Sequence, residues 1–193
     1  IVGFEVEQMI MAELKGPHVP RWIANGDFAV QPYIVMEYVP GPTLLRRMLD
    51  QRLALDEVVK RGIAVAEALG DLHQQHVLHL DLKPANVLLN SRDEPVLTDF
   101  GLAKLIERDV QLTLTRTVLG TPAYIAPEMA SGRAGESTTA ADVYGLGAIF
   151  YELLSGRPPF TAESTPALLL KIVEEEARFA NADLRMPIEP AVG

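Results

Sequence analysis

An acid, a base and an amide stand close together in an otherwise apolar stretch of the chain, positions 77–89, which read VLHLDLKPANVLL. Asp81 can accept or orient a proton, and Lys83 can offset negative charge on a phosphoryl group. Asn86 can offer an amide oxygen to a hard cation. A simple reversal of chain direction needs no lysine two positions after an aspartate. The stretch therefore indicates a chemical site.

The turn-rich segment NSRDE separates two predicted strands, Val87–Leu89 and Pro95–Thr98. Asn86 directly precedes the first strand and Asp99 directly follows the second, so a hairpin would bring their oxygen atoms together. Carboxylate and amide oxygens suit Mg²⁺, which keeps water and phosphate oxygens in the rest of its shell. A base, a cation and two metal ligands, with no covalent nucleophile, suit phosphoryl transfer.

Hydrophobic periodicity predicts the elements that must position these residues. A strand is predicted at 33–39, before the turn Pro40-Gly41, and helices are predicted at Phe4–Leu14, from Leu55 to about His76, over Val143–Leu154 and from Thr165-Pro166. Asp56 is the expected N-cap of the second helix and Thr165 that of the last. The apolar face of the second helix comprises Leu55, Val58, Val59, Ile63, Ala66, Leu69 and Leu72. The helix over Val143–Leu154 is apolar nearly all round, which is typical of a buried helix.

Three histidines, His73, His76 and His79, recur at a spacing that would allow a metal site. No carboxylate or thiol joins them on that face in the sequence. We therefore interpret them as solvated or core histidines.

Composition limits the class of protein. The 193 residues correspond to one domain or part of a larger one, and a hydrophobic content of 48% supports a core. A net charge of −9, from 17 basic and 26 acidic residues, argues against a nucleic-acid surface. The chain has no cysteine and no long apolar run, so we expect a cytoplasmic location, with any membrane anchor outside this segment.

Together these motifs resemble the eukaryotic-type protein kinase family, and their amino-acid sequences are most similar to those of bacterial serine/threonine kinases. HLDLKPAN resembles the catalytic loop, DFG at 99–101 the metal-binding triplet, GTPAYIAPE at 120–128 the substrate-side segment, and residues 141–160 the central helix of the large lobe. The resemblance implies an α+β, protein-kinase-like fold.

The resemblance also implies a division of the chain as a partial protein kinase domain. Residues 1–36 would be the remnant of the small lobe, with its C helix and hinge-side strands. Residues 37–41 would be the hinge, and residues 42–193 the large lobe without its C-terminal helices.

Carried over residue by residue, the resemblance assigns the catalytic roles. Asp81 would be the catalytic base, Lys83 would contact the transferred phosphate, and Thr121 would hydrogen-bond near both. Asn86 and Asp99 would bind the nucleotide through Mg²⁺, with Mn²⁺ as an alternative. ATP would be the phosphoryl donor.

The nucleotide site would include four further positions around the adenine. Met36 would lie at the back of the pocket, the backbones of Glu37 and Val39 would hydrogen-bond the base, and Leu88 would form its floor. Glu7, on the first helix, would pair with the nucleotide-binding lysine.

The remaining positions would support the site or regulate it. Asp142 would brace the catalytic-loop backbone from below, and His79, Phe100 and Glu128 would also be structural. The candidate phosphorylation sites are Thr113, Thr115 and Thr117.

The sequence departs from the family pattern at both ends and at one internal position. The Gly-rich loop and the lysine of the family would precede Glu7, so Glu7 has no expected lysine partner within this chain. The arginine that would pair with Glu128 would lie in helices that follow this chain. We therefore expect a fragment of a longer kinase that is inactive alone. Leu80 stands where the family usually has arginine, so phosphates on the threonines would lose their main anchor, with Arg116 or Lys104 as weaker ones.

The leading interpretation is an ATP-dependent serine/threonine protein kinase that acts on protein substrates; dimerisation is left open. The alternative is a pseudokinase that serves as a binding module. A small-molecule kinase shares the logic of Asp81 and Asn86 but lacks a segment such as GTPAYIAPE.

Overall fold

The computed structural model describes residues 2–27, 31, 33–50, 53–100, 104–105 and 122–178. The elements in these ranges are α1 (Val2–Glu13), β1 (Trp22–Asn25), β2 (Ile34–Met36), α2 (Leu44–Asp50), α3 (Leu55–Gln74), β3 (Val77–Leu78), β4 (Val87–Leu89), β5 (Pro95–Leu97), β6 (Lys104–Leu105), α4 (Pro127–Ala130), α5 (Thr139–Ser155) and α6 (Thr165–Glu174). Short 3₁₀ turns occur at Pro84–Asn86, Pro122–Tyr124 and Ala134–Glu136. This mixture of helices and small antiparallel strands confirms the predicted α+β class.

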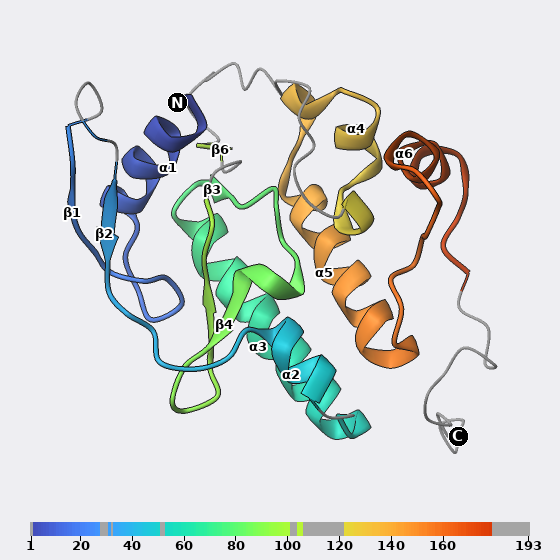
Figure 1. Cartoon of the computed structure of the whole chain (residues 1–193), viewed down its shortest axis with the longest axis horizontal. Helices are drawn as coiled ribbons and strands as arrows, with labels where there is room; N and C mark the ends of the chain where they lie inside the picture. Colours follow the sequence, from blue (N-terminus) through green and yellow to red (C-terminus); the bar gives the residue numbers. More distant parts are fainter. Residues whose placement is uncertain are drawn as a thin grey trace.

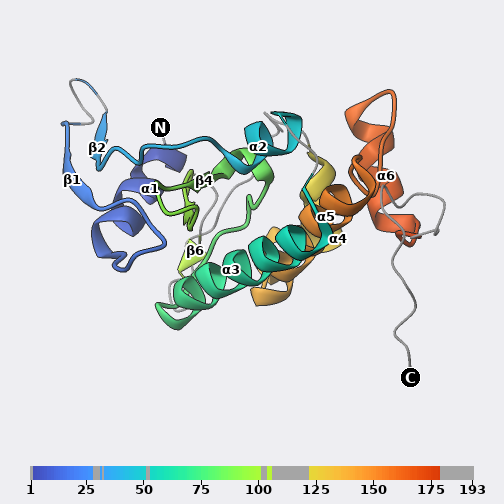
Figure 2. The ribbon, with the colours of Figure 1, turned by 90° about the horizontal axis from the view of Figure 1, so that it is seen from below.

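The elements are arranged from one side of the molecule to the other. Helix α1 and the β1–β2 pair lie on one side, α4, α5 and α6 lie on the other, and α3 and the β4–β5 hairpin lie between them (Figures 1 and 2). One buried hydrophobic cluster includes Ile10 of α1, Leu72 of α3, Val87 of β4 and Ile149 of α5. The core is therefore continuous across these elements. In the described part of the chain, no helix combines the length and the apolar character needed to cross a bilayer.

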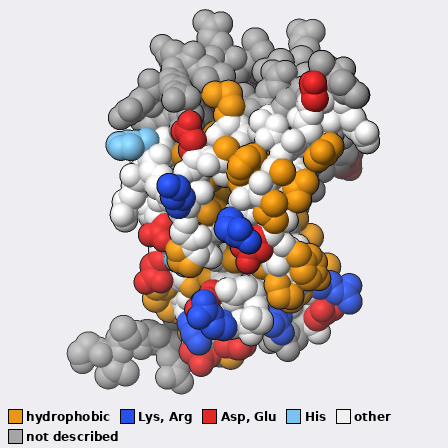
Figure 3. Space-filling model, turned by 90° about the vertical axis from the view of Figure 1, so that its left-hand side faces the viewer, with side chains coloured by type: hydrophobic (Ala, Val, Ile, Leu, Met, Phe, Trp, Pro, Cys, Tyr) orange, Lys and Arg blue, Asp and Glu red, His pale blue; other side chains and the backbone are white. Residues whose placement is uncertain are grey.

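The strands form antiparallel pairs, β1 with β2, β3 with β6 and β4 with β5. In the β4–β5 hairpin, Val87 lies opposite Leu97 and Leu89 lies opposite Pro95. This hairpin was predicted, and its return strand ends one residue early. Strand β2 is shorter than the predicted strand at 33–39. The β1–β2 pair exposes large hydrophobic side chains, and such side chains are visible on that face of the molecule (Figure 3).

Helix α3 buries only part of its predicted apolar face. Val58, Leu69 and Leu72 are buried as expected, whereas Val59 is 46% exposed and Ile63 is 54% exposed. Ala66 is also exposed. The core stripe is completed instead by Arg61, Gly62, Val65 and Ala68. The prediction of a single apolar face was therefore wrong, because the helix carries a second apolar stripe that no described residue buries.

The predicted N-caps of two helices were also wrong. Ala54, which offers no side-chain bond, occupies the N-cap of α3, and Asp56 lies in the first turn. There its carboxylate still interacts favourably with the helix dipole. Ser164 rather than Thr165 caps α6, since its side chain accepts a hydrogen bond from the Ala167 N–H.

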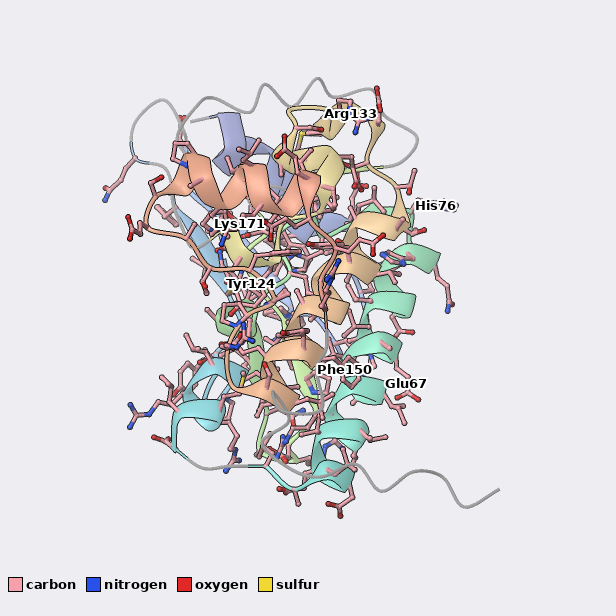
Figure 4. All side chains as sticks on the ribbon, turned by 90° about the vertical axis from the view of Figure 1, so that its right-hand side faces the viewer. Glu67, His76, Tyr124, Arg133, Phe150 and Lys171 are labelled. Carbon is pink, nitrogen blue, oxygen red and sulfur yellow. The ribbon has the colours of Figure 1, made fainter. Side chains whose placement is uncertain are left out.

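Helix α5 begins earlier than predicted and packs closely on α3. Thr138 caps it, and Gly156 ends it in the left-handed conformation with φ 81°. Phe150 of α5 covers Gly62 of α3 so closely that a Cβ at Gly62 would lie 1.5 Å from the ring (Figure 4). The helix is not buried all round, because Val143 is 60% exposed.

Candidate active site

Asp81, Lys83 and Asn86 converge in the segment that leads from β3 into β4. The Asp81 carboxylate accepts a bond from Lys83 Nζ at 2.6 Å and one from Asn86 Nδ2 at 3.0 Å. Asn86 Nδ2 also donates to the Asp81 backbone carbonyl at 2.9 Å. The 3₁₀ turn Pro84–Asn86 makes this possible, because it brings the amide back over the aspartate. These contacts fix a half-exposed carboxylate beside a cation.

The hairpin places Asn86 and Asp99 at neighbouring ends of β4 and β5. Thr98 donates to the Asn86 carbonyl from its N–H at 2.9 Å and from its Oγ1 at 3.2 Å, so Asp99 follows the residue that faces Asn86. Asp99 is exposed and has a φ of 65°, in the left-handed region that few residues other than glycine adopt. Backbone strain of this kind persists at functional sites when the surroundings hold it.

The donor set at this mouth fits Mg²⁺. The amide nitrogen of Asn86 makes both of its bonds to Asp81, so its oxygen is the atom left for a cation, and Asp99 adds a carboxylate. Among the described residues, no three His, Asp or Glu side chains gather into a metal site. A site with so few protein ligands suits a cation that takes its remaining ligands from phosphate and water.

Glu7 of α1 reaches the same region from the other side of the molecule. Burial raises the pKa of Glu7, and the negative charge of Asp99 raises it further. The Phe100 backbone N–H interacts with the Glu7 carboxylate in the direction that lowers this pKa. Glu7 therefore interacts with the backbone that follows Asp99. Its pairing with a lysine stays a prediction.

Asp142 of α5 supports the segment from below. One carboxylate oxygen accepts the His79 N–H at 2.9 Å and the other accepts the Leu80 N–H at 2.8 Å. His73 Nε2 lies 2.8 Å from the first oxygen. Asp142 is 1% exposed, so these bonds satisfy a buried charge. Asp142 thus reaches the ring of one of the three histidines, His73, from a distant helix, and no metal-ligating cluster forms among the described residues.

His79 is fully buried beneath the site. Its Nδ1 accepts the Asp81 N–H at 3.3 Å, which assigns the proton to Nε2, and Nε2 donates to the Thr98 carbonyl at 3.1 Å. Its ring lies 5.1 Å from the ring of Phe100. Burial lowers the pKa of His79, so the ring is neutral. The prediction of a core histidine is confirmed for His79.

Leu80 packs into an apolar cluster. Its side chain is 6% exposed and its φ is 60°, and it shares the cluster with Ala126, Met129 and Ala141 of the α4–α5 region. Leu80 therefore joins the segment between β3 and β4 to α4 through hydrophobic contacts.

The positions predicted around the adenine lie at the end of β2, in the stretch after it, and in β4. The Glu37 N–H donates to the Arg21 carbonyl at 2.8 Å, so this N–H already has a partner. Met36 is 37% exposed, and Val39 and Leu88 are half-buried. Their contact with adenine stays a prediction.

Other predicted positions cannot be placed in this way. Thr113, Thr115, Thr117, Arg116 and Thr121 lie outside the described residues, as does the side chain of Lys104. Glu128 lies in the first turn of α4 and is half-buried.

Two contacts escaped the sequence interpretation. The Tyr124 hydroxyl donates to the Glu152 carboxylate, and burial raises the pKa of Tyr124, with the Glu152 contact adding to it. Gly145 of α5 faces Leu82, and a Cβ there would lie 3.3 Å from the Leu82 carbonyl oxygen. No local signal reveals the tyrosine contact, but the glycine in the middle of an apolar helix could have indicated close packing.

Comparisons with known proteins agree with this geometry. The family model described as "Protein kinase domain" matches residues 4–191. The chain is 38% identical over 177 residues to a probable serine/threonine-protein kinase PknB of Lactococcus lactis, covering 91% of this chain and 28% of the relative. It is 38% identical over 186 residues to the serine/threonine-protein kinase PkaA of Streptomyces coelicolor, covering 92% and 33%. It is 36% identical over 146 residues to the serine/threonine-protein kinase PknB of Mycobacterium leprae, covering 75% and 23%. The chain spans between a quarter and a third of the length of the first two relatives.

Proposed function

The chain belongs to the protein kinase domain family, and on this premise we propose that it carries the phosphoryl-transfer centre of an ATP-dependent serine/threonine protein kinase. The observation that carries the proposal is the Asp81 carboxylate held between Lys83 Nζ and Asn86 Nδ2, at 2.6 Å and 3.0 Å. Residues 37–41 would form the hinge between the remnant of the small lobe and the large lobe.

In this proposal the side chains act mainly through position and charge. Asp81 orients a serine or threonine hydroxyl of a protein substrate and accepts its proton as the oxygen bonds to the γ-phosphorus of ATP. The bond between that phosphorus and the ADP oxygen breaks. Lys83 offsets the negative charge of the phosphoryl group during transfer. Asn86 and Asp99 would hold Mg²⁺, which when bound offsets the charge of the phosphate oxygens.

The contacts below the site explain how these groups stay in place. Asp142 holds the two N–H groups that precede Asp81, and His79 holds the Asp81 N–H itself. Glu7 contacts the backbone that follows Asp99. The base and the metal ligand are thus each supported by another element, which lowers the reorganisation needed during transfer.

The test is phosphate transfer from labelled ATP to peptides by the complete protein that contains these residues. We expect transfer to serine and threonine, and we expect Asp81→Asn to lower the rate at least about a hundredfold while nucleotide binding is kept. Asp50→Asn, the same change on the exposed end of α2, is the matched control and should keep the parent rate. Transfer by Asp81→Asn at the parent rate would refute the assignment of the base. Mg-ATP binding without transfer in the parent would favour a pseudokinase.

A further inference from the structure

A groove of about 560 Å³ lies beside the proposed hinge, bounded by segments that are distant in sequence. Its walls are the loop 14–21 between α1 and β1, the stretch 37–40 after β2, and the hairpin residues 90–92 with Val96. Asp81, Lys83, Asn86 and Asp99 do not line it. The groove is therefore separate from the catalytic side chains, although it borders the stretch that we propose to contact adenine.

The loop that forms the first wall is held by hydrogen bonds to its neighbours. The Gln75 side chain accepts the Lys15 N–H and donates to the Lys15 carbonyl, both at 2.9 Å. The His18 carbonyl accepts the Leu97 N–H at 2.8 Å, and His18 Nδ1 lies 2.7 Å from the Asp71 carboxylate. These bonds fix the loop against α3 and β5.

The hairpin wall is equally well anchored. Asn90 Oδ1 accepts the N–H groups of Arg92 and Glu94 at 2.8 Å and 3.0 Å. Asp93 pairs with Arg61 at 2.6 Å and with Arg47 at 3.2 Å, and the hydrogen bond from Arg61 is the main reason that the pKa of Asp93 is lowered. Because both walls are held in place, a ligand would meet a preformed groove and the ordering cost of binding would be small.

The charge of the groove is opposite to that of the chain. Lys15, Arg21 and Arg92 line it with one carboxylate, Glu37, whereas the whole chain has a net charge of −9. Arg92 also pairs with Glu94 at 2.9 Å, so the three cations face two carboxylates in total. The Arg21–Glu37 pair, at 3.9 Å with both side chains more than half exposed, is weak. Lys15 forms no ion pair with another described side chain. The face shown in Figure 3 carries Lys and Arg side chains, with Asp and Glu beside them, among hydrophobic ones. The groove therefore favours an anionic ligand.

The groove also offers apolar surface. Pro17 and Pro40 in its lining are exposed, Val39 is half-buried, and Tyr38 is 83% exposed. An inorganic anion would use only the cations and would leave this surface exposed. An extended chain could satisfy both, because the cations come from the two ends of the loop 14–21 and from the hairpin turn.

We propose that the groove binds an extended peptide segment of a partner protein in which acidic residues flank an apolar side chain. Such a segment would touch the loop 14–21 and the β4–β5 hairpin at the same time. The loop directly follows α1, which is the helix that carries Glu7. The proposal concerns binding alone and does not depend on the proposed kinase activity.

The test uses the complete protein that contains these residues and an array of decapeptides, without nucleotide. The peptides carry one Leu or Phe flanked by Asp and Glu, by Lys, or by Ser and Gln. We expect retention of the acidic set. Fluorescence anisotropy then measures the affinity for the acidic peptide that binds best. The double variant Lys15→Glu, Arg92→Glu should bind this peptide at least tenfold more weakly, or by about 1.4 kcal/mol. Lys60→Glu, the same reversal on the exposed outer face of α3, should change binding less than twofold.

Three results would overturn the proposal. The first is equal retention of the acidic and basic sets, or parent-like binding by the double variant. The second is displacement of the peptide by Mg-ATP, which would place it in the nucleotide site. The third is that the parent protein forms a dimer and binds no peptide, and that the double variant is a monomer. This result would assign the groove to a second copy of this chain. The free energy of unfolding of the double variant in urea should equal that of the parent, which excludes misfolding as the cause of lost binding.

Discussion

The Asp142 carboxylate and the His79 N–H are 63 positions apart in sequence and 2.9 Å apart in the structure. Through this bond and the one to Leu80, helix α5 holds the backbone that carries Asp81. Both bonds are buried, so they decide the position of the catalytic segment more than its local sequence does.

Replacement of Asp142 should therefore damage stability and catalysis together. Asp142→Ala leaves two backbone N–H groups unsatisfied, each of which costs about 1–3 kcal/mol when buried. We expect a lower free energy of unfolding in urea and at least a tenfold loss of kcat in the complete protein. His73→Ala removes only the third bond to Asp142 and is the matched control. A parent-like kcat for a folded Asp142→Ala variant would contradict this role.

Asp99 should act on metal-dependent nucleotide binding. Asp99→Ala removes a proposed ligand of Mg²⁺, so we expect a weaker affinity for ATP in the presence of Mg²⁺ and little change in its absence. Isothermal titration with and without the cation measures the difference. Asp81→Asn serves as the comparison, because it should keep the Mg²⁺ dependence. An equal loss of affinity under both conditions would assign Asp99 a structural role only.

Because Leu80 stands where an arginine is expected, the rate of peptide phosphorylation should depend only weakly on phosphorylation of the threonines at 113, 115 and 117. Since Leu80 is buried in an apolar cluster, it offers no donor to a phosphate. Replacement of all three threonines by alanine should lower the peptide phosphorylation rate less than about tenfold, or 1.4 kcal/mol in barrier height. A larger drop would show that another cation anchors the phosphate. Leu80→Arg should destabilise the protein, because it buries an unpaired charge, whereas Leu80→Met should be tolerated.

Alanine replacements at three glycines can distinguish the cost of steric overlap from the cost of backbone strain. At Gly41, with φ 151°, a Cβ would lie 1.8 Å from the Leu89 carbonyl oxygen, whereas at Gly16, with φ 123°, nothing lies within 4 Å. Gly16→Ala should cost about 1–2 kcal/mol from conformation alone, and Gly41→Ala should cost more. Gly70→Ala, in the interior of α3 with open space around it, should stabilise by about 0.5–1 kcal/mol. Urea unfolding of the three variants gives the order, and equal costs at Gly41 and Gly16 would contradict the overlap.

The buried His79 should make stability depend on pH. Its pKa is lowered in the folded state, so the unfolded chain binds more protons. The stability contributed by neutral His79 is present above its ordinary pKa of about 6.5 and is lost as pH falls below that value toward its folded pKa. His79→Gln should flatten the unfolding free energy between pH 7.5 and pH 5.5. His76→Gln, on an exposed histidine, should not; an unchanged slope in His79→Gln would assign the dependence to other groups.

The sequence by itself determined the elements whose signals are local. The β4–β5 hairpin follows from two short apolar runs and a turn-rich link, and the convergence of Asn86 and Asp99 follows from the hairpin. The spacing of Asp81, Lys83 and Asn86 also predicted that they share one site, because the few residues between them cannot carry them far apart. The long helix α3 was predictable from its periodicity, although its ends were not.

Tertiary packing decided which surfaces are buried and which distant groups meet. Val59 and Ile63 are as apolar as the buried residues of α3, yet they lie on the face of the helix that the packing of α5 does not cover and are 46% and 54% exposed. Asp142 reaches His73, His79 and Leu80, and Glu7 reaches the backbone of Phe100, through contacts between elements far apart in the chain. No periodicity or turn signal encodes such pairs, because they depend on how helices pack and on which buried polar groups need partners.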